Sequence, residues 1–126
     1  MHHSRLAGVV IDCKADDPDK AARFWAEALG RPLDAKHPGT RGNYRVLESP
    51  SNDLTVEIQR VDHESRAHLD IETDDIEAEI ERLEKLGAKV ASRLERWVVM
   101  QAPTGQRFCV VRAHSPDFPK NANRWD

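Results

Sequence analysis

Acidic and histidine side chains alternate with apolar ones along a stretch in the middle of the chain. His68, Asp70 and Glu72 share one side of a predicted strand, and Leu69 and Ile71 share the other. The apolar side must pack against a helix, which turns the polar side toward a concave surface. A histidine titrates near neutral pH and nearby carboxylates can exchange its proton, so the pattern indicates acid–base chemistry in a ligand site.

Further candidates lie on other predicted strands. Asp12 occupies the position in strand 6–13 that Glu72 occupies in strand 67–73, and it can act with His68 or pair with an arginine. Glu57 is a second candidate acid or base. Tyr44 and Trp97 lie at corresponding places 53 residues apart and are candidate stacking walls for a ligand. Cys13 shares the apolar side of its strand and is expected to be a core residue.

A repeat positions these residues. Residues 17–30 resemble residues 74–87, each starting with Asp and ending with Gly, which predicts helices over Asp17–Leu29 and Asp75–Leu86. We expect their apolar faces to be buried through Phe24 and Trp25 on the first helix and Ile80 and Leu83 on the second. The acidic run of the second helix is interpreted as a solvated surface; it comprises Glu77, Glu79, Glu81 and Glu84.

Strands surround each predicted helix in the same order. One strand precedes each helix, and three follow it, the first of these near 31–36 and near 88–94. The chain is therefore an α+β domain of two β-α-β-β-β modules, over about 5–62 and 66–113, whose curved mixed sheet surrounds a cleft. Residues 114–126 predict an irregular tail, and His2 and His3 are expected to be disordered.

Composition excludes several classes of protein. Lys and Arg total 19 against 22 Asp and Glu, which argues against a nucleic-acid or anionic-membrane partner. The longest apolar run, Leu6–Ile11, is far shorter than the roughly 20 residues that a membrane span needs. Cys13 and Cys109 are isolated and form no CxxC pair, so neither a disulfide framework nor a zinc knuckle is predicted, and a reducing cytoplasm is expected.

The repeated plan resembles the vicinal oxygen chelate superfamily, which includes glyoxalase I, extradiol dioxygenases and bleomycin-resistance proteins. The resemblance rests on VVIDCKADDPDKAARFWAEALG at 9–30, HLDIETDDIEAEIERLEKLGA at 68–88 and VVMQAPTGQRFCVV at 98–111. It is strongest to the glyoxalase-like domain branch. The resemblance specifies the fold closely. It implies little about the reaction, because many reactions share this fold.

The resemblance also implies where a metal would bind. The family takes a histidine from the first strand of each module and a carboxylate from the last. In this sequence those positions are Gly8 and Glu57 in the first module, and His68 and Cys109 in the second. Glycine has no donor, and a thiol in an apolar strand resembles a buried core residue, so no metal and no other cofactor is expected.

The resulting hypothesis is a protein that binds a small organic ligand without a tightly held metal, either as a metal-independent enzyme of the glyoxalase-like lyase type or as a binding protein. His68 and Glu57 are the expected catalytic residues. The expected ligand contacts are Asp12, Asp70, Glu72, Trp97, Tyr44 and Cys109. The alternatives are a metal-dependent lyase, isomerase or dioxygenase and a drug-sequestering protein, and a homodimer is left open.

Overall fold

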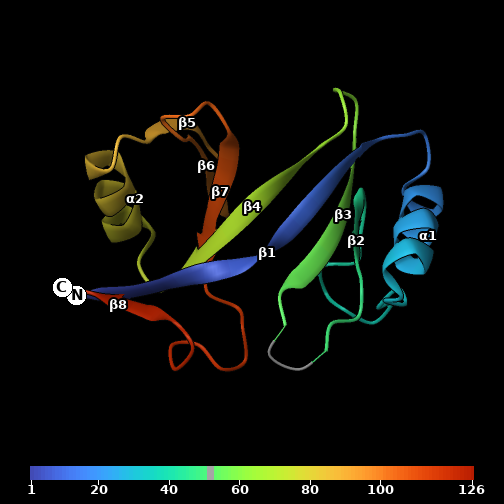
Figure 1. The fold of residues 1–126 in the computed structure, drawn as a ribbon, viewed down its shortest axis with the longest axis horizontal. Coiled ribbons are helices and arrows are strands. Elements are labelled where there is room, and N and C mark those ends of the chain that lie inside the picture. Colours follow the sequence, from blue (N-terminus) through green and yellow to red (C-terminus); the bar gives the residue numbers. More distant parts are fainter. Residues whose placement is uncertain (51–52) are drawn as a thin grey trace. The chain divides into compact units, whose positions relative to one another are not determined.

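One order of elements occurs twice along the chain in the computed structural model, which describes residues 1–50 and 53–126 (Figure 1). The first half contains β1 (His2–Lys14), α1 (Pro18–Leu29), β2 (Tyr44–Val46) and β3 (Thr55–Val61). The second contains β4 (Arg66–Thr73), α2 (Ile76–Lys85), β5 (Lys89–Arg93), β6 (Trp97–Gln101) and β7 (Arg107–Arg112), followed by β8 (Asn123–Trp125). The α+β class and the repeated order are confirmed.

The chain forms two compact units. The first unit is Gly8–His68, and the second unit is Leu69–Asp126 together with Met1–Ala7. This division assigns the start of β1 to the second unit, because that part of the strand pairs antiparallel with β8. Neither α-helix of the described chain has the length and hydrophobicity needed to cross a membrane.

The two units use the same strand pairing. In the first unit β1 pairs in parallel with β3, and β3 pairs antiparallel with β2. In the second unit β4 pairs in parallel with β7, and β6 lies antiparallel between β7 and β5. The strand predicted near 31–36 is reduced to one bridge between Leu33 and Leu47, at the place that β5 takes in the second unit. Pro32 and Pro38 flank this segment and lack the N–H that a longer ladder requires.

Helix α1 begins and ends as its sequence predicts. Asp17 caps the helix by accepting a hydrogen bond from the backbone N–H of Asp19 at 2.9 Å, and Pro18 takes the first helical position. Gly30 ends the helix with φ +67°, a conformation that glycine adopts at little cost.

The buried face of α1 differs from the predicted one. Ala22, Leu47 and Ile58 form the core, and Trp25 packs against it as expected. Phe24 lies outside this core with 62% of its surface exposed, and its ring meets that of Trp25 edge to face. The prediction that Phe24 is buried is wrong, because two adjacent helical residues are about 100° apart and only one of them can face the sheet.

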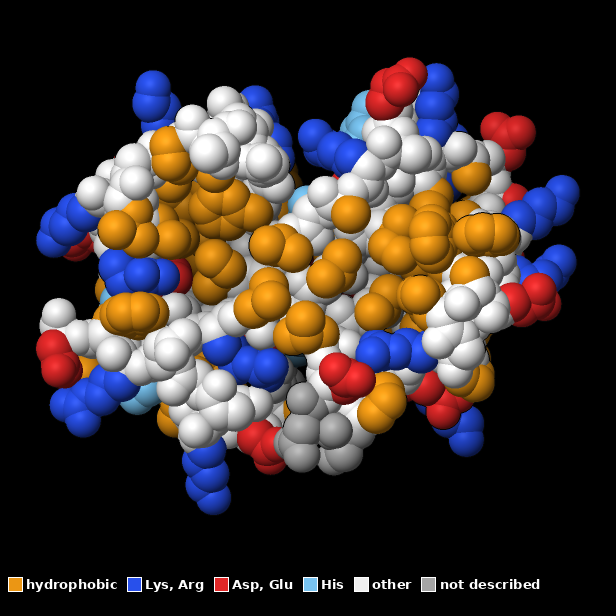
Figure 2. Space-filling view, in the orientation of Figure 1, with side chains coloured by type: hydrophobic (Ala, Val, Ile, Leu, Met, Phe, Trp, Pro, Cys, Tyr) orange, Lys and Arg blue, Asp and Glu red, His pale blue; other side chains and the backbone are white. Residues whose placement is uncertain are grey.

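Helix α2 covers a larger core in the second unit. Ile80 and Leu83 are buried as predicted, against Met100 and Val110. The cap is Asp75, whose carboxylate accepts from the backbone N–H of Ala78 at 3.0 Å. Figure 2 shows hydrophobic side chains gathered between helix and sheet in each unit, with charged groups around the rim.

The chain ends were predicted to be unstructured, and both are ordered. His2 lies on β1 with 7% of its surface exposed, and its Nε2 is 2.8 Å from Oε1 of Glu79. His3 contacts Asp74 through both its ring and its backbone N–H. The short strand β8 corrects the expectation of an irregular tail.

Glu79 is the buried centre of this arrangement, which corrects its interpretation as part of a solvated helix face. Arg82 donates two hydrogen bonds to its carboxylate, at 2.9 and 2.8 Å, and the guanidinium of Arg82 lies 4.0 Å from the ring centroid of Trp125. Trp125 in turn donates to the hydroxyl of Ser4. Burial alone would raise the pKa of Glu79, but hydrogen bonds from Arg82, His2 and Ser4 outweigh it and hold that pKa below its ordinary value.

We expect Glu79→Gln to lower the free energy of unfolding by roughly 3 kcal/mol at pH 7, because it leaves the buried partners of the carboxylate without their counter-charge. The folded-state pKa of Glu79 is depressed, so its contribution is present above the unfolded pKa, near 4.5, and is lost as pH falls through the folded pKa. Urea unfolding of both proteins between pH 7 and pH 3 measures this. A constant difference across that range would contradict it.

Phe24→Ala is expected to cost about 1 kcal/mol or less, because the ring is exposed and loses mainly its edge contact with Trp25. Leu47→Ala, at a site 1% exposed in the same core, is expected to cost about 2–5 kcal/mol. Chemical denaturation of the two variants checks the corrected helix face. Equal losses would show that Phe24 is buried after all.

Candidate functional site

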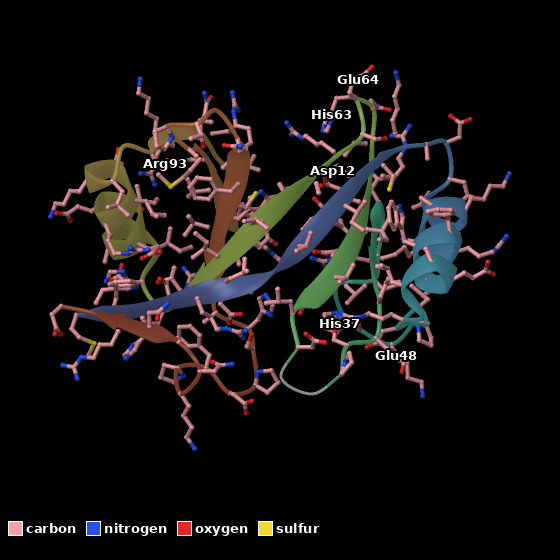
Figure 3. All side chains as sticks on the ribbon, in the orientation of Figure 1. Asp12, His37, Glu48, His63, Glu64 and Arg93 are labelled. Atoms are coloured by element: carbon pink, nitrogen blue, oxygen red, sulfur yellow. The ribbon has the colours of Figure 1, made fainter. Side chains whose placement is uncertain are left out.

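The two sides of β1 in the first unit carry different chemistry. Ile11 and Cys13 face α1 and pack against its core, and burial raises the pKa of the Cys13 thiol. Cys13 is therefore the core residue that the sequence predicted. Asp12, which Figure 3 labels on β1, lies between Ile11 and Cys13 in the sequence and therefore projects from the opposite side of the strand. We call this side of the first unit its open face.

Asp12 and His68 form a hydrogen-bonded pair on the open face. Nδ1 of His68 lies 2.8 Å from Oδ2 of Asp12, with 13% and 2% of the two side chains exposed. An ionised carboxylate only accepts hydrogen bonds, so Nδ1 of His68 is the donor in this contact. The second oxygen of Asp12, Oδ1, is buried and accepts no hydrogen bond from the described residues.

Arg66 is the third member of this group. Its Nε lies 3.4 Å from the same Oδ2 of Asp12, and 51% of its side chain is exposed. Arg66 and His68 are two residues apart on β4 and so project to the same side. Asp12 therefore contacts a constant positive charge and a titratable imidazole together.

Two predicted residues on neighbouring strands extend the open face. Gln59 pairs with Asp12 in the ladder between β1 and β3, and its Nε2 donates to the hydroxyl of Tyr44 on β2 at 3.0 Å. Glu57 lies two residues before Gln59 and opposite Val10. The first unit thus holds four of the predicted site residues: Asp12, Tyr44, Glu57 and His68.

The second unit holds the other four, and there the structure gives Glu72 an unexpected role. Its carboxylate is fully buried and accepts hydrogen bonds from the backbone N–H groups of His114 and Ser115, at 3.1 and 3.0 Å, and from the Ser115 hydroxyl. Arg5 lies 3.8 Å away. Glu72 therefore anchors the tail to β4.

The remaining predicted residues of the second unit lie on one side of its sheet. Asp70 pairs with Cys109 across β4 and β7, and Trp97 pairs with Val111 across β6 and β7. Val98 and Val110, the neighbours of Trp97 and Cys109 along their strands, belong to the core beneath α2. Trp97 and Cys109 therefore project away from the helix.

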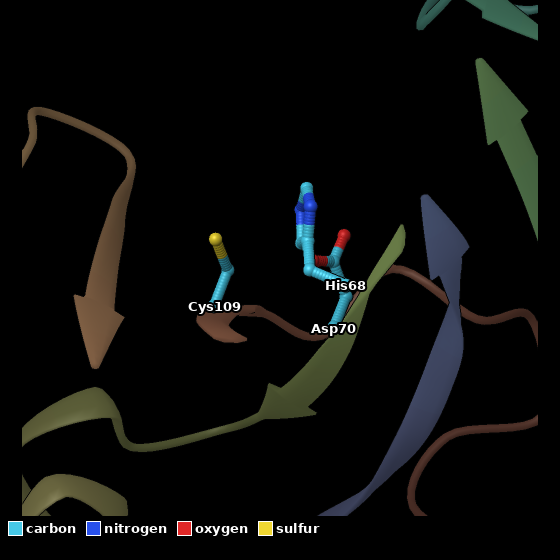
Figure 4. Close-up of side chains that lie close together, drawn as sticks. All are labelled: His68, Asp70 and Cys109. Carbon is cyan, nitrogen blue, oxygen red and sulfur yellow. The ribbon is translucent and has the colours of Figure 1, made fainter. Parts of the chain in front are cut away.

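One of the metal positions implied by the family resemblance, Gly8, has no room for a ligand side chain. A Cβ added to Gly8 would lie 2.5 Å from the backbone oxygen of Thr55, a separation that real Cβ atoms essentially never show. The close approach of β1 to β3 thus excludes a side chain at the first-module histidine position. Figure 4 draws three side chains that carry potential metal donors: His68 and Cys109, which are two of the implied positions, and Asp70.

Sequence reasoning missed two functional contacts. Arg66 continues the alternation of His68, Asp70 and Glu72 by one step toward the N-terminus, and this period was the signal that could have identified it. Three other arginines of strands or strand ends have different partners: Arg45 binds Asp19, Arg60 binds Asp62, and Arg107 binds Gln101. The contact between Glu72 and Ser115 spans 43 residues and carries no local signal.

Comparisons with known proteins place this fold. A family model described as a glyoxalase-like domain matches residues 8–111. Methylmalonyl-CoA epimerase from Mycobacterium tuberculosis is 17% identical with a TM-score of 0.58, covering 87% of this chain and 88% of that one. A glyoxalase/bleomycin resistance protein/dioxygenase superfamily member from Vibrio splendidus 12B01 is 16% identical with a TM-score of 0.55, covering 87% and 99%.

A hypothetical protein from Bacillus halodurans C-125 is 12% identical with a TM-score of 0.58, covering 89% and 96%. No curated protein sequence matches significantly. Identities this low show a shared fold alone. The family match covers most of the sequence, and it shows that the chain belongs to the glyoxalase-like domain family.

Proposed function

We propose that this chain is a metal-independent enzyme that removes a proton from carbon in a small organic molecule, with His68 as the base. The pairing of His68 with the buried carboxylate of Asp12 is the observation that carries the proposal. A carboxylate at Nδ1 fixes the orientation of an imidazole and stabilises the imidazolium that forms when Nε2 takes a proton.

The reaction balances without a further reactant. Nε2 of His68 takes a proton from a carbon next to a carbonyl group, and the electron pair of that C–H bond passes to the carbonyl oxygen. Glu57 then gives a proton to the same carbon from the opposite face while the electron pair moves back from the carbonyl oxygen to that carbon, which gives the epimer. A positioned acid–base group of this kind contributes about 100- to 10,000-fold to such a step.

Glu57 is the second catalytic group of the proposal. Its pairing with Val10, two residues from Asp12 along β1, places it on the open face one ladder step from the Asp12–His68 pair. From there its carboxyl group would exchange a proton with the substrate on the side away from His68. Tyr44 is proposed to contact the ligand from β2.

The proposed ligand contacts of the second unit are Asp70, Glu72, Trp97 and Cys109. Trp97 and Cys109 project from the side of the sheet away from α2. Glu72 has the least capacity to bind a ligand, because its carboxylate already accepts hydrogen bonds from the tail.

Hydrogen exchange at carbon tests this function directly. The protein is incubated in D₂O with a panel of small ketones, carboxylic acids and thioesters, and the loss of C–H signals is followed by NMR. We expect at least one compound to exchange a carbon-bound hydrogen for deuterium, and we expect His68→Gln to slow that exchange about 100-fold or more. Asp12→Asn is also expected to slow it, because the imidazole loses the acceptor that sets its tautomer.

His63→Gln is the matched control, because His63 is exposed at the turn between β3 and β4 (Figure 3). The His63→Gln protein should catalyse the hydrogen exchange at the wild-type rate. Melting temperatures show whether each variant is folded. A folded His68→Gln protein with wild-type exchange would contradict the role of His68. Ligand binding without exchange of any compound would favour a sequestering protein instead.

We expect protein purified without chelator to contain well under one equivalent of divalent metal per chain, because the backbone at Gly8 excludes a ligand there. Elemental analysis and exchange assays with added EDTA measure this. Gly8→His is expected to lower the melting temperature without raising the metal content. A stoichiometric metal that His68→Gln or Cys109→Ser removes would overturn the metal-independent mechanism.

A further inference from the structure

The contact that Arg66 makes with Asp12 uses only part of its guanidinium. Nε points to Oδ2 of Asp12, and neither Nη group donates a hydrogen bond to the described residues. Arginine has five N–H donors in a planar fork that matches the two oxygens of a carboxylate. With half of the side chain exposed, the outer edge of this fork is accessible to a small anion.

The strand sets the distance between this fork and the proposed base. Residues two apart on a strand are separated by about 6.6 Å along its axis and project to the same side. Arg66 and His68 therefore present an anion-binding group and a proton acceptor to one small molecule. A carboxylate held by Arg66 would place a carbon two or three bonds away beside the imidazole.

Charge also favours an anion at this end of the open face. Asp12 and Arg66 balance each other, so uptake of a proton by His68 leaves the group with a net positive charge. A bound carboxylate offsets that charge as it develops in the transition state. Glu57 would repel an anion, but it lies on β3, on the other side of β1 from Arg66.

We propose that Arg66, beside the Asp12–His68 pair, binds the anionic group of the substrate and that the substrate is a small carboxylic acid. This inference rests on the proposed function, because it names the substrate class of the same site. Arg66 binds the carboxylate in both the ground state and the transition state. Its loss should therefore raise KM more than it lowers kcat.

Binding of simple carboxylates tests the inference without requiring turnover. Acetate, malonate and succinate are titrated into the protein by NMR, with malonamide as the neutral counterpart of malonate. We expect malonate to bind the wild type and Arg66→Gln to weaken it about tenfold or more, which corresponds to 1.4 kcal/mol. Arg66→Lys should restore only part of the affinity, because an ammonium lacks the bidentate fork.

Arg41→Gln is the matched control, since it removes the same charge from an exposed side chain in the first unit. It should leave malonate binding within about twofold of the wild type, which is too small for the loss of a hydrogen bond to a charged group. The inference is overturned if no carboxylate binds the wild type, or if Arg66→Gln and Arg41→Gln weaken binding equally. Equal effects of Arg66→Gln on malonate and malonamide would overturn it as well.

The two proposals fail in different ways. If His68→Gln abolishes carbon exchange while Arg66→Gln leaves malonate binding and KM unchanged, the proposed function stands and the substrate class is wrong. If Arg66→Gln abolishes malonate binding but no compound exchanges, the anion site stands and the enzymatic function is wrong. His68→Gln should retain malonate binding in either case.

Discussion

Three carboxylates are buried in the part of the chain that the structure describes, and a buried charge is tolerated only where hydrogen bonds or opposite charges replace water. Asp12, Glu72 and Glu79 are each at most 1% exposed. Each collects partners from distant parts of the sequence and fixes one part of the structure. Asp12 ties β1 to the start of β4, Glu72 ties β4 to the tail, and Glu79 ties α2 to both chain ends.

The partners of these carboxylates decide which of them is suited to chemistry. Backbone N–H groups and a hydroxyl surround Glu72, and none of them changes charge near neutral pH. Glu79 receives two hydrogen bonds from Arg82 and is closed off by the strand that carries His2. Asp12 differs because its partners are a mostly buried histidine and a half-exposed arginine, the two groups on which the proposed chemistry depends.

Gly8 separates this chain from the metal-binding pattern that its fold suggests. A missing ligand is usually one substitution away from recovery, but here the backbone oxygen of Thr55 occupies the space that a side chain would need. The chemistry that we propose for this unit is therefore proton transfer and anion binding by its side chains.

The sequence by itself determined the elements and the side to which each strand residue points. The repeat predicted both helices, and alternation predicted that Asp12 and Cys13 project to opposite sides of their strand, because a strand has a period of two. These features depend on residues within a few positions of one another, where spacing carries the information. The same local reasoning failed for Phe24, since Phe24 and Trp25 are both apolar and only packing chose between them.

Only the tertiary structure decided the partners. Arg66 meets Asp12 across 54 residues, Ser115 meets Glu72 across 43, and His2 meets Glu79 across 77. Such pairs form when sheet pairing brings distant strands together, and a single sequence holds no signal for which of many arginines or carboxylates will meet. The start of the chain, predicted to be disordered, and Glu79, predicted to be solvated, form one buried ion-pair cluster for the same reason.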